Sequence, residues 1–333
     1  MVHDQYAERY AAHRWKIPPT FNIAEACCRR WADAPERTAI LSEDAAGHQA
    51  SYSYIDLMHE KHLYLFDYYD YIKETDVQSI VIDNNEIYIV TKENNIKLLL
   101  DQNDKRFIPI EMLNFKSIEF HEKKVVFELV KNCKTIFDIG ANIGWYTLNF
   151  GKLQNVEKIY AFEPIPYTFN FLKRHIKLNN IHNAEIFNIG LSDEIGEKEF
   201  FWTEEETGSS SMRNIRERSK INKVKSKLDT LDNFVKNRDI KIDFIKCDVE
   251  GAELFVFKGG IETIKKHKPI VFSEMLRKWS AKFDYNPNDI IRLFSDIGYK
   301  CYSIINNKLC EFDEMTDDVQ ETNFLFIHSE SSL

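Results

Sequence analysis

Acidic residues stand at the ends of several apolar runs in this chain of 333 residues. Asp138 and Glu163 follow two such runs, and Asp248 and Glu274 follow two more, about 100 residues further on. Short apolar runs of this kind read as buried strands, and the carboxyl ends of parallel strands meet at one sheet edge, where α/β proteins bind ligands. Carboxylates gathered there can accept hydroxyl hydrogen bonds, remove a proton or bind a hard cation.

The clearest element for positioning these acids is the stretch 135–147, which reads as strand, tight turn and helix. Gly140 and Gly144 allow a sharp turn and a close approach of a ligand to bare backbone. Asn142 is the expected N-cap of the helix that begins at Trp145. The G-x-x-x-G spacing departs from the G-x-G-x-x-G of dinucleotide sites, and ordinary strand-to-helix turns also use glycine.

A second unit follows at once. The run 158–162 reads as a strand that ends at Glu163, and Pro164 and Pro166 open a helix that continues to Lys177. Glu163 comes 25 residues after Asp138. That is close to the distance at which a βαβ unit places an acid on ribose hydroxyls. Acids at two successive strand ends predict an adenosine-type ligand.

The composition limits the binding partners and the cellular location that can be expected of this protein. A formal net charge of −9 makes non-specific nucleic-acid binding a poor candidate. The six cysteines form no C-x-x-C pair, and several lie in apolar runs, which favours reduced core thiols. The sequence shows neither an apolar run of membrane-spanning length nor a signal-peptide core. These features predict a cytoplasmic protein without a membrane span.

Residues 1–56 differ in composition from the rest. Eleven of the sixteen alanines fall in the first 50 residues, where Lys16 is the only lysine. Residues 21–33 read as a helix and residues 37–42 as a strand. The segment resembles the extreme N-terminus of acyl-CoA synthetases, through Trp15-x-Ile-Pro and Phe21-Asn-x-Ala, but the later motifs of that family are absent. We therefore expect a leader of foreign origin without ligase activity.

The remaining chain divides into two further regions. Residues 57–120 predict an aromatic-rich helix over 57–72 and an antiparallel meander over 79–83, 86–91 and 96–101. Scaffold is the favoured role for the meander, with substrate or partner binding as the alternative. Residues 121–333 alternate strands and helices, which predicts a mostly parallel sheet with helices on both faces. The polar stretch 203–227 predicts a solvated loop or, alternatively, a mobile lid. A helix is expected over 228–237, and His175, His182 and His267 are expected at the surface.

The residues from about 127 to 328 resemble the FkbM family of S-adenosylmethionine-dependent methyltransferases, with weaker similarity back to about residue 57. One motif alone would be moderately specific, whereas the set in this order is strong. The motifs that carry the resemblance are Phe137–Gly144, Phe162–Pro164, Asn188–Asp193 and Ile245–Glu253, with Gly259 and Glu274 beyond.

This resemblance implies a class I methyltransferase fold, a Rossmann-like α/β sheet of seven mostly parallel strands, and S-adenosyl-L-methionine as cofactor. It also implies residue roles: Glu163 would hold the ribose hydroxyls, and Ser192 with Asp193 would lie near the adenine. The methionine half would be cradled by Asp138, Gly140, Asn142 and Gly144. The expected acceptor is a hydroxyl of a sugar, a glycan precursor or a similar small molecule, and the oligomeric state is left open.

The acids Asp248, Glu250 and Glu274 are the expected catalytic group. Methyl transfer to oxygen requires an aligned hydroxyl and an acceptor for its proton, and Asp248 is the first choice for that acceptor, with Glu250 second. Glu250 and Glu253 could instead be first-turn acids that favour the helix dipole. The acids could also bind Mg²⁺, although without a spacing signature no metal site is predicted. The rival functions are an NAD-dependent oxidoreductase and a non-catalytic scaffold that keeps the fold.

Overall fold

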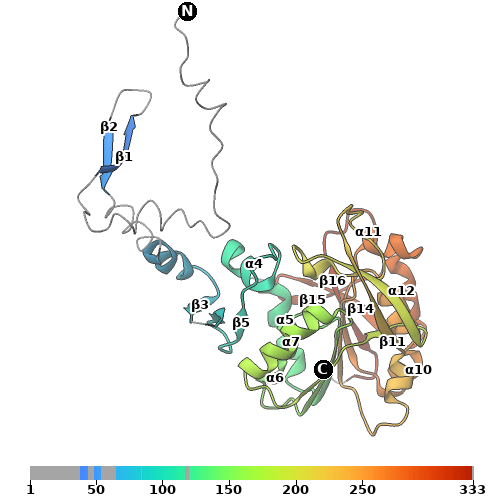
Figure 1. Cartoon of the computed structure of the whole chain (residues 1–333). Helices are drawn as coiled ribbons and strands as arrows, with labels where there is room; N and C mark the ends of the chain where they lie inside the picture. Colours follow the sequence, from blue (N-terminus) through green and yellow to red (C-terminus); the bar gives the residue numbers. More distant parts are fainter. Residues whose placement is uncertain (1–37, 44–48, 54–64, 84, 117–119, 332–333) are drawn as a thin grey trace, which may run out of the picture. The chain divides into compact units, whose positions relative to one another are not determined.

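The computed structural model describes residues 38–43, 49–53, 65–83, 85–116 and 120–331, and the chain divides into two compact units, Met1–Tyr71 and Ile72–Leu333 (Figure 1). In the first unit, β1 (Thr38–Glu43) pairs antiparallel with β2 (Gln49–Ser53), which confirms the strand expected at 37–42. The helix expected at 21–33 lies outside the described residues. Of the helix expected at 57–72, the structure describes residues 65–72, and these are helical. The boundaries at 56 and 120 remain predictions.

The second unit is built on an eight-stranded sheet. Five neighbouring strands from one edge are parallel, and the next strand, β16, runs antiparallel to its two neighbours, so the expected mostly parallel sheet is confirmed. In spatial order the strands are β8 (Ala184–Phe187), β7 (Lys158–Phe162), β6 (Thr135–Ile139), β12 (Phe244–Cys247), β13 (Ile270–Glu274), β16 (Asn323–His328), β14 (Tyr299–Ile305) and β15 (Lys308–Glu311).

The eighth strand, β15, was not expected from the sequence. It pairs with β14 through a tight hairpin in which Asn306 and Asn307 have φ of 50° and 61°. Asparagine tolerates this left-handed backbone, which two-residue hairpin turns require. The strand is short and its side chains are at most half-buried, so its sequence carries little hydrophobic signal.

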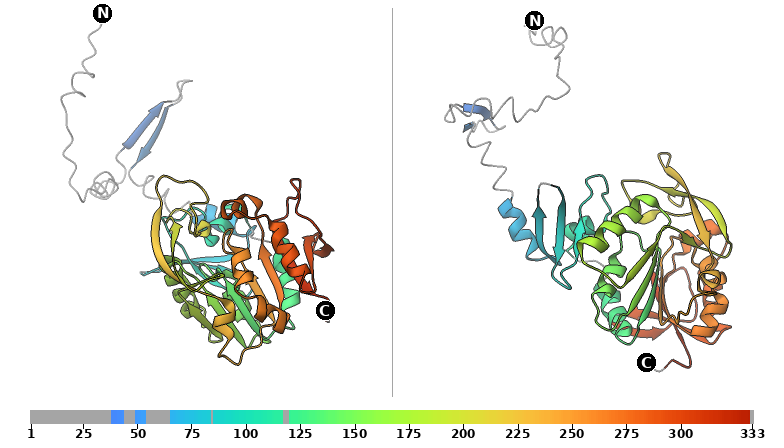
Figure 2. Two further views of the ribbon diagram at one scale, coloured as in Figure 1. Left: turned by 90° about the vertical axis from the view of Figure 1, so that its right-hand side faces the viewer. Right: turned by 60° about the horizontal axis from the view of Figure 1, so that its bottom comes forward.

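Helices cover both faces of the sheet, as expected (Figure 2). Neighbouring residues of β6 point to opposite faces, since Ile136 belongs to one buried cluster and Phe137 to the other. The first cluster includes side chains of α5 (Phe120–Val130), α6 (Trp145–Gly151) and α7 (Pro166–Leu178). The second includes α8 (Leu231–Val235), α9 (Glu253–Lys258), α10 (Ile261–His267) and α12 (Pro287–Ser295).

The expected meander is present as β3 (Val77–Ile82), β4 (Ile87–Thr91) and β5 (Lys97–Leu99), followed by α4 (Ile108–Phe115), which was not expected. A side chain of α7 and the side chain of Asn179, the residue that caps its C-terminus, hold the free edge of β5. His175 Nε2 accepts the Leu99 N–H at 2.9 Å, while its Nδ1 lies 2.8 Å from the Ile143 carbonyl oxygen. Asn179 bonds both the N–H and the carbonyl of Lys97, at 2.7 and 2.8 Å. The meander is thereby fastened to the helix that follows β7.

The expectation that His175 lies at the surface is wrong. It is fully buried beneath β5, and burial lowers its pKa to about 4. The sequence does not show that the meander covers this face of α7. His182 is exposed as expected, and His267 is half-buried.

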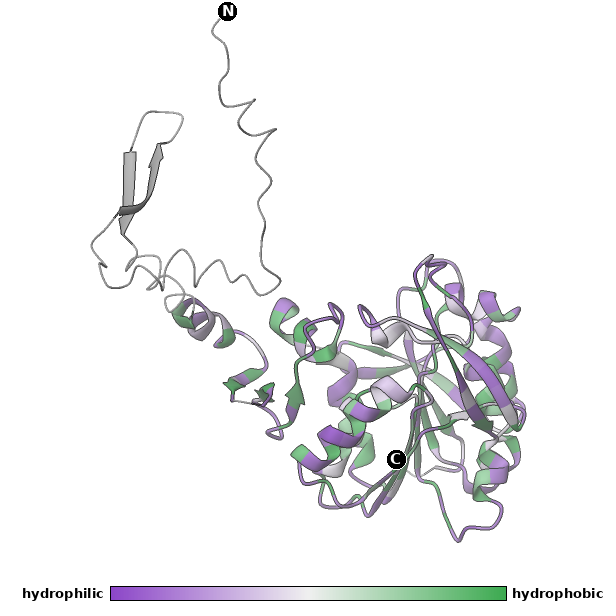
Figure 3. Ribbon diagram, in the orientation of Figure 1, coloured by the Kyte–Doolittle hydropathy of each residue, from purple (hydrophilic) through white to green (hydrophobic). Residues whose placement is uncertain are grey.

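The interpretation of residues 203–227 as a loop is also partly wrong. β11 (Asn222–Asp229) pairs antiparallel with β10 (Gly196–Trp202) and parallel with β9 (Gly190–Leu191), forming a separate three-stranded sheet. Figure 3 shows this ribbon as largely hydrophilic, because lysines fill its outer face and disguise the alternation of a strand. The helix α8 consequently begins at Leu231 instead of 228.

The described helices include none long and apolar enough to cross a membrane. Of the cysteines that the structure describes, Cys133, Cys247 and Cys301 are buried and Cys310 is half-buried, all as free thiols. This agrees with the expected reduced core thiols; Cys27 and Cys28 lie outside the described residues.

Candidate active site

The turn between β6 and α6 places bare backbone at the carboxyl edge of the sheet. Gly140 and Gly144 have φ of 74° and 93°, values that favour glycine. The expected N-cap is wrong: Gly144 occupies that position, and Asn142 Oδ1 instead accepts the N–H of Ile143 at 2.7 Å. The cap is supplied from the strand, because Asp138 Oδ2 accepts both the Thr147 N–H, at 3.0 Å, and its hydroxyl, at 2.5 Å.

The side chain of Lys246 contacts the turn between β6 and α6. Its ammonium donates to the Gly140 carbonyl oxygen at 2.8 Å. The same Nζ lies 3.6 Å from Asp138 Oδ1 and 3.5 Å from Asp248 Oδ2. Asp138 is completely buried, so the lysine offsets a charge that water cannot reach. The sequence interpretation missed this residue, and a lysine in the apolar strand just before Asp248 was the available signal.

Glu163 follows β7 and lies beside the same turn. Its Oε1 accepts the Ile165 N–H at 2.9 Å and the Thr168 hydroxyl at 2.7 Å, while Oε2 accepts the Asn142 N–H at 2.8 Å. Burial raises the pKa of Glu163 to about 7 against the effect of these donors. A carboxylate oxygen has two lone-pair sites, so Oε2 can accept one further donor without losing its present bond.

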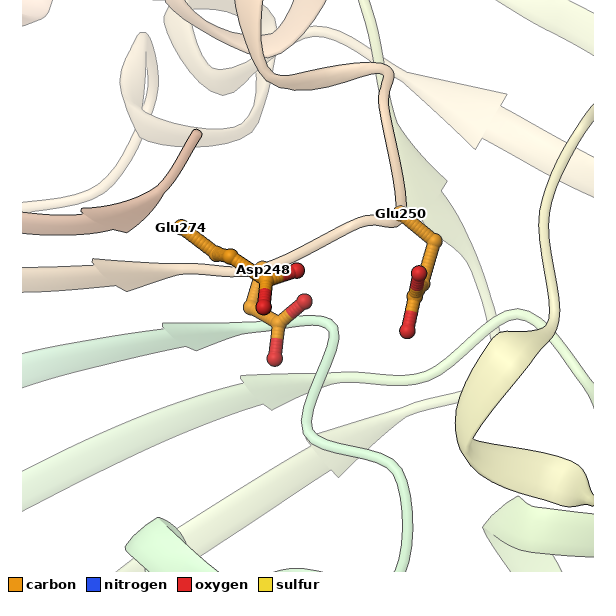
Figure 4. A group of neighbouring side chains, drawn as sticks. All are labelled: Asp248, Glu250 and Glu274. Atoms are coloured by element: carbon orange, nitrogen blue, oxygen red, sulfur yellow. The ribbon is translucent and has the colours of Figure 1, made fainter. Parts of the chain in front are cut away.

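The three expected catalytic acids come together at the ends of β12 and β13 (Figure 4). Asp248, Glu250 and Glu274 each offer an oxygen within 4.8 Å of the others. Burial, followed by the nearby carboxylates of Asp248 and Glu253, raises the pKa of Glu250 well above its usual value. Carboxylates this close repel one another when ionised, and a proton or a cation between them relieves that repulsion. Oxygen donors in such a group also suit a hard cation such as Mg²⁺.

Glu253 has a structural role. Its Oε1 accepts the N–H groups of Val249 and Gly251 at 3.0 and 3.1 Å, and the Tyr285 hydroxyl donates to Oε2 at 3.2 Å. Burial raises the pKa of Glu253 to about 7. These bonds shape the turn that carries Glu250, whose φ of 54° is unusual for a residue other than glycine.

Two cavities adjoin these acids. The smaller, of about 60 Å³, is lined by Glu163, Ile165, Leu191 and Phe200 among others. The larger, of about 220 Å³, is lined by Trp145, Tyr146 and Lys246 together with charged residues from more distant loops. The wall that both share consists of Gly140, Asn142, Thr207, Gly208, Asp248 and Glu250.

The stretch 203–221, called here the roof segment, helps to close both cavities. It contains the short helix η2 (Thr207–Ser209). Asp104 Oδ2 accepts the Thr207 N–H at 3.0 Å and its hydroxyl at 2.6 Å, and the Ser211 hydroxyl donates to the Glu250 carbonyl at 2.8 Å. The roof segment therefore bridges the loop after β5 and the turn after β12. Its movement as a lid remains a prediction.

The structure places the other expected residues as follows. Gly140, Asn142, Glu163, Asp248 and Glu250 all line one or both cavities. Asp138 and Gly144 support the β6–α6 turn from within, and Glu274 adjoins Asp248 without lining either cavity. Ser192 and Asp193 follow Leu191 and are also outside the two linings.

Comparison with known proteins identifies the class. The family model for the methyltransferase FkbM domain matches residues 138–301. This stretch includes the turn after β6, the wall that both cavities share and the three expected catalytic acids. This part of the chain matches the FkbM methyltransferase domain, and the sheet with helices on both faces agrees with the class I methyltransferase fold that the resemblance implied.

Two curated relatives are fungal methyltransferases. The chain is 27% identical to Methyltransferase 1 of Beauveria bassiana (strain ARSEF 2860) over 142 residues, which is 37% of this chain and 57% of that protein. It is 30% identical to methyltransferase sdnD of Sordaria araneosa over 173 residues, which is 43% of this chain and 66% of that protein. The chain thus spans less than two thirds of the length of either relative.

Solved structures resemble the chain more distantly. A methyltransferase FkbM from Methylobacillus flagellatus KT has a TM-score of 0.37 at 18% identity, covering 59% of this chain and 44% of that one. A putative methyltransferase from Streptococcus mutans in complex with SAH has a TM-score of 0.38 at 9% identity, covering 63% and 99%. Both scores lie below 0.5, so neither likeness supports a conclusion about this chain.

Proposed function

We propose that this chain transfers a methyl group from S-adenosyl-L-methionine to a hydroxyl of a sugar, a glycan precursor or a similar small molecule. One observation carries the proposal: Asp248 and Glu250 belong to the wall that both cavities share. A carboxylate in that position can meet a group held in one cavity and a hydroxyl held in the other. The match of residues 138–301 to the FkbM methyltransferase domain supports the same chemistry.

The residues present fit this cofactor. The smaller cavity combines apolar side chains, suited to an adenine, with Glu163, whose Oε2 can accept a ribose hydroxyl. A side chain at Gly140 would distort the turn that lines both cavities, because its Cβ would lie 1.8 Å from the Asp248 carbonyl oxygen. Gly140 and Asn142 would contact the methionine half, with Asp138 and Gly144 supporting them. S-adenosylmethionine, when bound, supplies an electrophilic methyl group on sulfur.

Asp248 is the proposed acceptor of the hydroxyl proton. Its side chain is 39% exposed, in contrast to the buried Asp138, so a hydroxyl can reach it. Lys246 lies 3.5 Å from Asp248 Oδ2, and the proposed general base is this carboxylate. Glu250, whose raised pKa favours the protonated form, would hold the acceptor by donating a hydrogen bond.

In this proposal the roof segment moves to admit the ligands. Sites for small molecules of cofactor size typically enclose about 300–1,000 Å³, more than the two cavities provide together. Thr207 and Gly208 lie in the shared wall, so outward movement of η2 would enlarge both cavities at once. This favours the interpretation of the roof segment as a lid.

The test is product analysis. The protein is incubated with S-adenosylmethionine whose methyl group carries deuterium and with a panel of sugars, sugar phosphates and glycosides. We expect mass spectrometry to find a labelled O-methyl ether, and fragmentation to place the label on one hydroxyl. Label on nitrogen or carbon would contradict the O-methyl assignment. Activity lost with EDTA and restored by Mg²⁺ would show that the three acids hold a cation instead of serving as base.

Cofactor affinity should depend on pH through Glu163. The pKa of its carboxyl is about 7, and the ionised form accepts hydroxyl hydrogen bonds better than the protonated form. Affinity for S-adenosylhomocysteine should therefore fall as pH drops, to about one tenth between pH 8 and pH 6. Titration calorimetry at several pH values measures this change. Glu163→Gln should bind more weakly at pH 8 and lose most of the pH dependence; an equal slope in both proteins would rule Glu163 out.

A further inference from the structure

Three arginines converge on one buried glutamate at the edge of the larger cavity. Glu206 is 7% exposed, and its Oε1 lies 2.7 Å from Arg216 and 3.8 Å from Arg106. Arg218 bonds the other oxygen, Oε2. Arg106 also lies 2.5 Å from Glu111. Three guanidinium groups thus form ion pairs with two carboxylates, and Arg216 also interacts electrostatically with Glu250.

We call Arg106, Arg216 and Arg218 the arginine cluster. The cluster lies between two cavities. Arg106, Arg216 and Glu206 line the larger cavity. Arg106, Arg216 and Glu206 also line another cavity, of about 690 Å³, together with Arg218. Asp248 and Glu250 line the larger cavity as well, so one part of its lining is basic and another is acidic. A molecule that spans this cavity meets both kinds of charge.

We propose that the acceptor carries an oxyanion, a phosphate or a carboxylate, that the arginine cluster binds while the hydroxyl to be methylated lies at Asp248. The proposal rests on the methyl-transfer function proposed above and specifies its substrate class. The guanidinium fork matches carboxylate and phosphate oxygens, and two or more arginines directed at one carboxylate form a ready-made oxyanion site. Glu206 occupies that site in the free protein and would be replaced by the acceptor.

Other contacts hold Arg216 in place when Glu206 leaves. Its Nε donates to the Ser209 hydroxyl at 2.9 Å, and its guanidinium lies 5.4 Å from the centre of the Trp279 ring. When the roof segment is closed, the bonds between Thr207 and Asp104 hold it independently of Glu206. Arg216 is thus preorganised in the closed state by contacts other than Glu206.

The first test measures binding without turnover. Inorganic pyrophosphate and glucuronate are titrated calorimetrically into the full chain, wild type and variants. Arg216→Gln should lower the affinity for both probes about tenfold or more, because a charge-assisted bond is lost. Glu206→Gln should raise the affinity, because the competing internal carboxylate is gone. Arg292→Gln, on α12 with its own partner Asp289, removes the same charge elsewhere and should match the wild type.

Opposite effects of the two variants separate an oxyanion site from a purely structural one. If the arginines only anchor the roof segment, both variants should change binding in the same direction, which would overturn the proposal. Lack of measurable binding by the wild type would also overturn it. If Arg216→Gln weakens S-adenosylmethionine binding and leaves the probes unaffected, the cluster serves the carboxylate of the cofactor, and the proposal is wrong.

A second test uses turnover and distinguishes the two oxyanions. Methyl glucoside, glucose 1-phosphate and glucuronate offer similar hydroxyls with no charge, a phosphate and a carboxylate. We expect methylation of a charged acceptor over the neutral one, with the preferred charge showing which oxyanion is bound; preference for the neutral glucoside would overturn the proposal. Binding of S-adenosylmethionine is measured in parallel. Cofactor binding without oxyanion binding overturns this inference alone, whereas oxyanion binding without cofactor binding overturns the methyltransferase function.

Discussion

Replacing Asp248 with asparagine should lower kcat by about 10²–10⁴-fold, the usual contribution of a general base. Asparagine keeps the size of the side chain but cannot accept the hydroxyl proton. Affinity for S-adenosylmethionine should stay within about twofold of the wild type, since the expected cofactor contacts lie in the β6–α6 turn and at Glu163. Steady-state kinetics with the acceptor from the product analysis, together with cofactor titration, measure both quantities.

The matched control is Asp317→Asn. Asp317 is fully exposed and pairs only loosely with Arg277, at 3.9 Å, so its replacement should leave both kcat and cofactor affinity unchanged. Normal turnover by Asp248→Asn would remove the base role. A variant that also loses cofactor binding would show that Asp248 holds the ligand or the turn, and the proton acceptor would then have to be sought at Glu250.

Replacing Gly140 with alanine should destroy cofactor binding and destabilise the fold. The φ of 74° costs a residue with a side chain about 1–3 kcal/mol. The new Cβ would also meet the Asp248 carbonyl oxygen at 1.8 Å, a backbone atom that cannot turn aside. Overpacking of this kind costs about another 1–3 kcal/mol. We expect a clear fall in the free energy of unfolding, measured with urea, and cofactor binding too weak to detect.

Gly196→Ala tests whether these effects are specific. Gly196 begins β10, and a Cβ placed there meets nothing within 4 Å. This variant should therefore fold and bind the cofactor as the wild type does. If Gly140→Ala behaved in the same way, the β6–α6 turn would be neither as tight nor as close to Asp248 as the geometry indicates.

The framework of the site follows from local sequence signals. Apolar runs that end in acids predicted β6, β7, β12 and β13, and the parallel arrangement then brings Asp138, Asp248 and Glu274 to one edge. These signals are strong because each central strand is buried on both faces and is therefore apolar almost throughout. The acid stands out against that background.

Features that depend on distant contacts were not predictable in this way. His175 was expected at the surface because the sequence of α7 does not reveal that β5 covers it. The arginine cluster combines residue 106 with residues 216 and 218, which read as part of a solvated basic run. Glu206, which draws them together, has no distinguishing mark in the sequence. Tertiary packing determines both arrangements.

The most direct test of the account is calorimetric titration of the purified chain with S-adenosylmethionine, S-adenosylhomocysteine and NAD in parallel. We predict micromolar binding of the first two, about −8 kcal/mol, and no heat from NAD, because the β6–α6 turn lacks the dinucleotide glycine spacing. Binding of NAD alone would contradict the methyltransferase function and favour an oxidoreductase, and binding of none of the three would favour a scaffold that retains the fold.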